Sequence, residues 1–155
     1  MSVGLAVLCA GALAACSDSD GDSSASSSSA PPAMTGPGRS SVTVDGTPWE
    51  GNFASKCTKA GDTTSLAIYE QSGDPSLGGG ATISGDDTVV SVGLGDGTSG
   101  LGYSAGTPGV APATVVRSGD TFTVVGSASA ANAQDPAQPT STFEIVFACD
   151  SVTGE

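Results

Sequence analysis

Apolar and polar residues alternate along much of the chain after residue 41, which is the pattern of half-buried β-strands. The alternation starts at Val42 and Val44, ahead of an Asp45-Gly46 turn, and resumes over residues 51–57, where every second residue shares one face. Both segments are predicted strands. Six further candidates are bounded by Gly, Pro, Asp or Ser, namely 66–70, 88–94, 101–105, 113–117, 121–128 and 141–150.

The clearest local element is "ATVVRSGDTFTVVG", in which Ser118-Gly119-Asp120 separates two β-rich runs by a loop of hairpin length. No helical periodicity competes with the alternating pattern. About eight short strands at this spacing predict an all-β fold, either an antiparallel sandwich or a partly closed barrel. The pattern does not decide between the two.

The first 40 residues have a different character. Residues 3–15 are apolar or small, too few to span a membrane but typical of the core of a secretion signal. Residues 17–40 are rich in Ser, Pro and Asp and lack the apolar residues needed to fold. We therefore expect a signal peptide over 1–15, a disordered tether over 16–40 and a β-rich ectodomain over 41–155.

The amino-acid composition limits which ligands and partners the protein can bind. The chain has 4 basic and 16 acidic residues, a net charge of −12, which repels phosphate backbones and argues against nucleic acid. It has no histidine, and none of its four cysteines lie at C-x-x-C spacing. We expect neither a metal site nor a cofactor.

Two motifs look catalytic but lack their context. The segment 95–100 matches G-x-G-x-x-G, yet "LGYSAGTPG" follows it where a phosphate-binding helix is needed. The segment 102–106 matches G-x-S-x-G, but Ser104 has no histidine to activate it. We therefore predict no enzymatic activity, and we read Trp49, Tyr69 and Tyr103 as packing residues.

The segment Leu13-Ala14-Ala15-Cys16 resembles a bacterial lipobox, in which an aliphatic residue and two small residues precede the cysteine that receives the lipid. The resemblance implies that Cys16 carries diacylglycerol and palmitate and anchors the protein to the membrane. Cys9 lies within the leader, so we assign it no role.

Two stretches of the ectodomain sequence are similar to a known protein family. The stretches "SVGLGDGTSGLGYSAGT" (91–107) and "SGDTFTVVGSASAANAQDPAQPTSTFEIVFAC" (118–149) resemble the nineteen-kilodalton lipoprotein antigen family of mycobacteria. The resemblance implies a lipoprotein on the extracytoplasmic face of the cell membrane, exposed at the surface, with a glycosylated tether. It implies that Toll-like receptors sense the acylated N-terminus, and that the domain has no agreed activity. Family leaders begin with basic residues, which "MSVGLAVL" lacks, so we expect the true start upstream of Met1.

Cys57 and Cys149 match the cysteine pair of that family. We predict a disulfide between them, since an exported protein meets an oxidising compartment and strand parity points both thiols into the core. The expected function is an envelope antigen or adhesin-like binding module of unidentified ligand. The alternative is a carrier that holds an apolar ligand or a glycolipid inside the β-domain.

Overall fold

The computed structural model describes residues 39–73, 76–131 and 140–154, which lie within the compact unit 34–155. The predicted signal peptide (1–15), Cys16 and nearly all of the tether lie outside the described residues. In the described part of the chain, no helix is long and apolar enough to cross a membrane.

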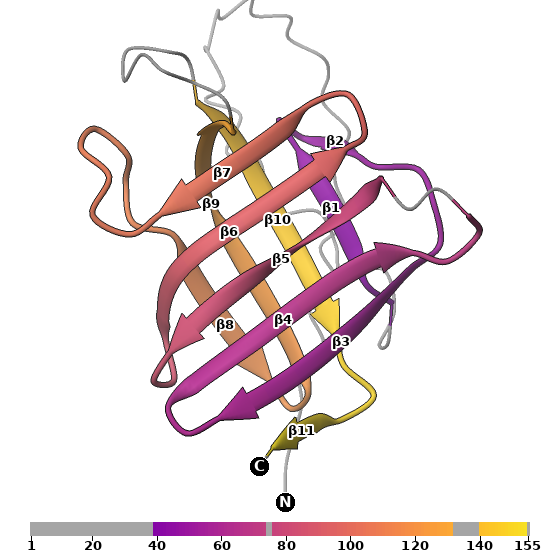
Figure 1. The fold of residues 1–155 in the computed structure, drawn as a ribbon, viewed down its shortest axis with the longest axis vertical. Coiled ribbons are helices and arrows are strands. Elements are labelled where there is room, and N and C mark those ends of the chain that lie inside the picture. The colour runs from indigo at the N-terminus through magenta and orange to yellow at the C-terminus, as the bar shows by residue number, and fades with distance from the viewer. Residues whose placement is uncertain (1–38, 74–75, 132–139, 155) are drawn as a thin grey trace, which may run out of the picture. The chain divides into compact units, whose positions relative to one another are not determined.

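The described residues confirm the all-β class, but they form eleven strands where eight were predicted (Figure 1). The strands are β1 (Ser41–Val44), β2 (Thr47–Pro48), β3 (Phe53–Ala60), β4 (Thr63–Glu70), β5 (Leu77–Ser84), β6 (Thr88–Asp96), β7 (Gly100–Ser104), β8 (Thr114–Ser118), β9 (Thr121–Ala130), β10 (Ser141–Ala148) and β11 (Val152–Gly154). The sequence pattern missed β2, β5 and β11. Strands β2 and β11 are very short, and β5 contains three consecutive glycines, which are uncommon in strands.

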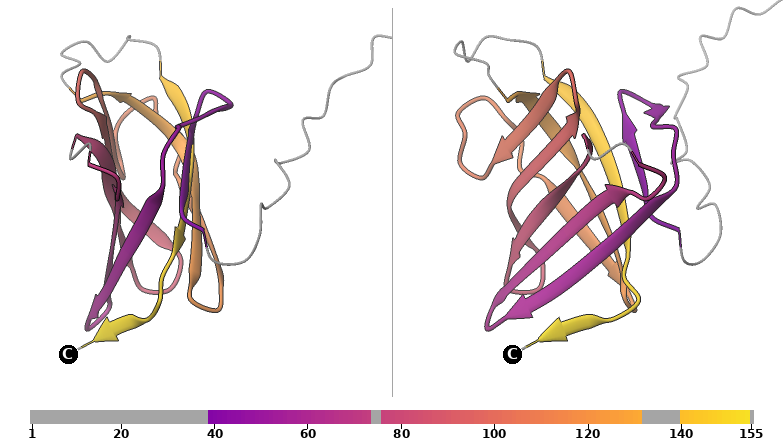
Figure 2. Two further views of the ribbon diagram at one scale, coloured as in Figure 1. Left: turned by 90° about the vertical axis from the view of Figure 1, so that its right-hand side faces the viewer. Right: turned by 45° about the vertical axis from the view of Figure 1, so that its right-hand side comes forward.

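Hydrogen bonds join the strands in the order β11-β3-β4-β5-β6-β7-β9-β10-β1-β2, with β8 also paired to β9. All neighbours are antiparallel except β11 and β3. The sheet curls so that β3 to β7 face β8, β9, β10 and β1, and Figure 2 shows these two layers edge-on. An isolated antiparallel bridge between Ser40, just before β1, and Phe53, at the start of β3, also joins the two layers. The result is a curled, incompletely closed sheet that has features of both predicted alternatives.

Strand β9 is the point at which the sheet changes layer. Its first half pairs with β8, from Thr121 to Val125, and its far end pairs with β7 through Ser129 and Ala130. Both partners therefore lie on the same edge of β9 and diverge from each other between these two regions. We call the place where β7 and β8 diverge along this edge the fork of β9. The residues that connect β7 to β8 lie there.

The core lies between the layers and consists of the inward-facing residues of alternating strands. Strand β10 shows the rule, because Phe143, Ile145 and Phe147 are buried while the residues between them are only partly covered. Trp49 packs against this core, as predicted. Tyr69 does not, because it lies on the outer face of β4 with 48% of its surface exposed.

Cys57 and Cys149 form a disulfide that ties β3 to the end of β10. Cys57 is buried within β3, and Cys149 follows the last residue of β10. Ser40 reinforces the same junction, since its hydroxyl pairs with that of Ser55 at 2.6 Å and accepts the backbone N–H of Ala148 at 3.1 Å. One covalent link and a small polar cluster therefore hold the layers together here.

The β1–β2 turn is fixed to β10. Asp45 and Gly46 both have positive φ, at 49° and 76°, as a two-residue type I′ hairpin turn requires. The Asp45 carboxylate accepts the Thr142 backbone N–H at 2.7 Å, and the Asp45 N–H donates to the Thr142 carbonyl at 2.9 Å. The hydrogen bond from the Thr142 N–H, and after it one from the Ser141 hydroxyl, lower the pKa of the Asp45 carboxyl.

Candidate ligand-binding pocket

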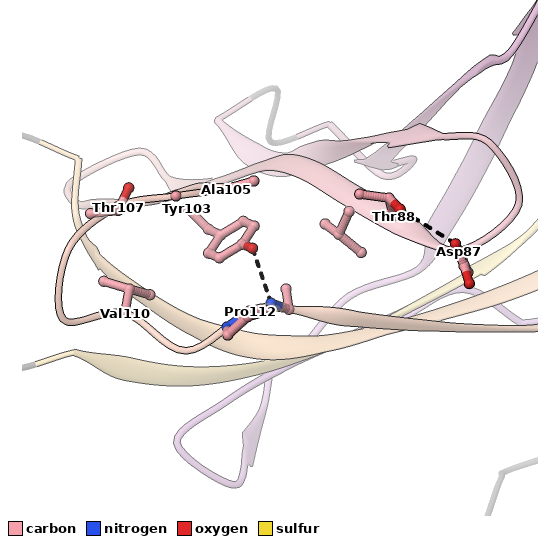
Figure 3. A pocket seen from close by; sticks show the side chains of 10 residues that line it. Asp87, Thr88, Tyr103, Ala105, Thr107, Val110 and Pro112 are labelled. Atoms are coloured by element: carbon pink, nitrogen blue, oxygen red, sulfur yellow. Dashed lines mark hydrogen bonds between the residues drawn. The ribbon is translucent and has the colours of Figure 1, made fainter.

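A pocket of about 410 Å³ lies beside the fork of β9 (Figure 3). Three segments line it: 87–89 at the start of β6, 103–107 at the end of β7, and 110–113 ahead of β8. Its buried lining is Val89, Tyr103 and Ala113, and the remaining lining residues are partly or fully exposed. The pocket thus has an apolar floor and a solvent-exposed rim.

A β-bulge sets the β6 side of the floor. The register with β5 shifts between Thr82 and Ile83, so that Val90 is an extra residue in β6. The bulge turns Val89 inward although the regular alternation from Val92 points it outward. The Val90 carbonyl accepts the Ala105 N–H at 2.8 Å and so fixes the first residue of the β7–β8 connection.

Two consecutive turns build the opposite wall. The Thr107 N–H donates to the Ser104 carbonyl at 3.2 Å, with Gly106 at φ 81° in third position. The Val110 N–H then donates to the Thr107 carbonyl at 3.2 Å, across Pro108 and a Gly109 that also has φ 81°. Pro second and Gly third are the preferences of a type II turn. Local turn chemistry therefore holds this wall in place.

Tyr103 closes the floor between the two layers. It pairs with Val92 on β6 and points inward, and its phenol oxygen accepts the backbone N–H of Ala113 at 3.1 Å. Ala113 sits close to Gly126 of β9, where a Cβ would come within 2.8 Å of both Ala113 and Phe143. Gly126 thus gives Ala113 the space to approach the fork.

The segment 95–100 forms a tight turn and no phosphate loop. The Asp96 carboxylate accepts the backbone N–H groups of Thr98 and Ser99, at 2.9 and 2.6 Å, and both of their hydroxyls. The hydroxyl of Ser99 first, and then these amides, hold the pKa of Asp96 far below its usual range. Strand β7, and not a helix, begins at Gly100.

Acid should weaken the fold through Asp45 and Asp96. A carboxylate whose pKa is lowered by folding stabilises the native state above its unfolded pKa, about 3.9, and loses that contribution as the pH falls. We expect the melting temperature to fall as the pH is lowered from 5 to 2, and Asp96→Asn to flatten this decline. Thermal melts across that range measure it. Asp62→Asn is the control, and an equal flattening by both variants would contradict the assignment.

Ser104 does not form a nucleophile elbow. It is the last residue of β7, it is exposed, and a turn follows it in place of a helix. Among the described residues, no hydrogen bond joins its hydroxyl to a base, and no group of three metal-ligating side chains occurs. The motif glycine Gly106 instead shapes the pocket wall.

A second, smaller cavity of about 140 Å³ lies at Trp49, beside Val44, Leu94 and Leu101. Trp49 is therefore a packing residue that also borders this cavity. The sequence pattern predicted no ligand site, and it indicated a packing role for Tyr103 without the hydrogen bond that its phenol accepts. The one signal in the sequence for this pocket was Tyr103, an aromatic residue that precedes two turns containing Gly106 and Gly109.

The sequence of the chain is similar to those of known lipoproteins. The sequence model of the family described as "Mycobacterium 19 kDa lipoprotein antigen" matches residues 33–149. Lipoprotein LpqH of Mycobacterium avium is 34% identical over 115 residues, which cover 71% of this chain and 68% of that protein. The chain therefore belongs to the mycobacterial 19 kDa lipoprotein antigen family.

Proposed function

We propose that this protein is an envelope lipoprotein, anchored through Cys16 on the extracytoplasmic face of the membrane, whose β-domain is a non-catalytic binding module. Family membership supports the lipoprotein class. The order of a short apolar run, two small residues and Cys16 supports the anchor. The acylated N-terminus would be the part that host pattern-recognition receptors meet.

One observation carries the binding role, namely the pocket beside the fork of β9. Its volume lies within the range of small-molecule sites, and its wall is fixed by two turns and by the bond from Ala105 to Val90. A site formed before its ligand arrives loses little conformational freedom on binding. The described lining holds no His, Cys or Lys, and its one carboxylate, Asp87, is exposed, which supports a binding module over an enzyme.

The anchor at Cys16 makes a testable prediction. Wild-type protein should partition into detergent, because acyl chains at Cys16 would bury dozens of methylene groups at about 0.8 kcal/mol each. Cys16→Ser should move the protein to the aqueous phase and abolish acyl labelling. Detergent phase separation with a radiolabelled fatty acid measures both.

Cys9→Ser is the matched control, since this cysteine lies in the leader and should not change labelling. Acyl labelling that survives in the Cys16→Ser variant would refute the anchor. The result does not depend on the binding role of the domain, so the two parts of the proposal are tested separately.

The pocket also favours the second candidate, a carrier of an apolar ligand or a glycolipid. The Cys16→Ser protein, produced in a mycobacterial host and recovered from envelope extract, has no covalent lipid at that position. Solvent extraction followed by mass spectrometry should then release a stoichiometric lipid if the domain is a carrier. An extract without lipid would contradict the carrier hypothesis and would be consistent with the binding module.

A further inference from the structure

The hydroxyl groups that line the pocket differ in whether they donate a hydrogen bond to another part of the protein. The Thr107 hydroxyl donates to the Ser104 carbonyl at 2.8 Å, and the Thr88 hydroxyl donates to the Asp87 carboxylate at 3.3 Å. The Tyr103 phenol oxygen, in contrast, acts as an acceptor toward the Ala113 N–H. A phenol that accepts one hydrogen bond still has its own hydrogen to donate.

Among the residues that the structure describes, no acceptor is bonded to that phenol hydrogen. Tyr103 is only 5% exposed, and in Figure 3 its hydroxyl points toward the segment at Pro112, where the dashed line marks the hydrogen bond that it accepts. A buried donor is costly to leave without an acceptor. Among the described lining residues, the Tyr103 phenol is the one hydroxyl group that donates no hydrogen bond within the protein.

Charge defines the rest of the specificity. Asp87 is exposed at the rim, and no Lys or Arg lines the pocket. The whole chain has a net charge of −12, which adds to the repulsion of an anion. Free fatty acids and phosphorylated head groups are thus disfavoured, whereas an uncharged carbonyl oxygen is a suitable partner for the phenol.

We propose that the pocket binds neutral acyl esters, with the ester carbonyl accepting a hydrogen bond from Tyr103 and the acyl chain against Val89, Val110 and Ala113. This inference rests on the proposed binding role of the pocket and specifies its ligand class. Tyr103 acts as a specificity-determining residue that touches the ligand.

The test uses the mature chain from residue 16 onward with Cys16→Ser, labelled with ¹⁵N and titrated at pH 7 with three probes of similar length. Methyl hexanoate carries the neutral carbonyl, hexanoate carries the charge, and 1-chlorohexane has no carbonyl oxygen. Dissociation constants come from the amide shifts of the pocket residues, including Ala113. Wild-type protein should bind methyl hexanoate about three- to tenfold more tightly than either of the others.

Tyr103→Phe keeps the ring and removes the donor. This variant should raise the dissociation constant of methyl hexanoate about three- to tenfold and change that of 1-chlorohexane by no more than about twofold. Tyr69→Phe, on the outer face of β4, is the matched control and should change neither constant. The comparison of probes on wild-type protein needs no variant, so the inference stays testable if Tyr103→Phe fails to fold.

The outcomes separate the two levels of the argument. If no probe gives saturable shifts at pocket amides in wild-type protein, the proposed binding role of the pocket fails and the ester inference fails with it. If 1-chlorohexane binds as tightly as the ester, or if Tyr103→Phe binds the ester unchanged, the binding role stands and the inference is overturned.

Discussion

Reduction of the Cys57–Cys149 disulfide should lower the free energy of unfolding by about 4–5 kcal/mol. The bridge closes a loop with a sequence separation of 92, so it removes much conformational freedom from the unfolded chain. Domains of this size are stable by about 5–15 kcal/mol. We therefore expect the melting temperature to fall by about 15–20 °C on reduction.

The measurement is a thermal melt with and without reductant, compared with the variant Cys57→Ala/Cys149→Ala. The double variant should melt low in both conditions and show no response to reductant. Alkylation of denatured wild-type protein should label neither thiol until a reductant is added. Labelling without reductant, or a melting temperature that reductant leaves unchanged, would contradict the bridge.

The second large effect is expected at Gly79 in β5. A Cβ at this position would lie 2.1 Å from the Gly93 carbonyl oxygen and 2.9 Å from a methyl group of Leu94. The first of these contacts is with backbone, so β6 itself would have to move. Gly79→Ala should destabilise the domain by about 1–3 kcal/mol, or more where β6 cannot adjust.

Gly93→Ala is the matched control, because a Cβ there meets nothing within 4 Å. This variant should stay within about 0.5 kcal/mol of wild type or gain slightly from the loss of glycine in a strand. Denaturant unfolding of both variants measures the difference. Equal stability of the two would show that β5 does not need glycine for its close packing.

The same glycines explain what the sequence did not reveal. No strand was predicted over Gly78, Gly79 and Gly80, because glycine is depleted in strands. In the structure a Cβ at Gly78 or Gly80 would meet a carbonyl oxygen of β4 at 2.6 Å, and a Cβ at Gly79 would meet a carbonyl oxygen of β6. Close contact between strands is a tertiary property, and the local pattern does not record it.

Strands with apolar alternation were predictable, since burial of one face determines their period. The segments around β9 and β10 and the hairpin loop at Ser118-Gly119-Asp120 appear close to their predicted places. The disulfide could also be anticipated, from compartment and strand parity. The bulge at Val90 could not, because it breaks the alternation by one residue.

The pocket lay beyond sequence reasoning for a related reason. Its three segments, 87–89, 103–107 and 110–113, meet only because β9 pairs first with β8 and then with β7. No spacing along the chain signals that change of partner. The turn residues Gly106, Pro108 and Gly109 were visible, but not the surface that they would shape.

The covalent loop between Cys57 and Cys149 also has a mechanical consequence. A force that pulls on the N-terminal side of Ser40 and on the residues after Cys149 would act first on β1, β2 and β11, which lie outside the loop. At Cys57 the force passes through the bridge to Cys149 and bypasses every strand from β4 to β10. The hydrogen bonds between strands inside the loop would bear no direct load, so a domain pulled between these two points would yield only at its margin.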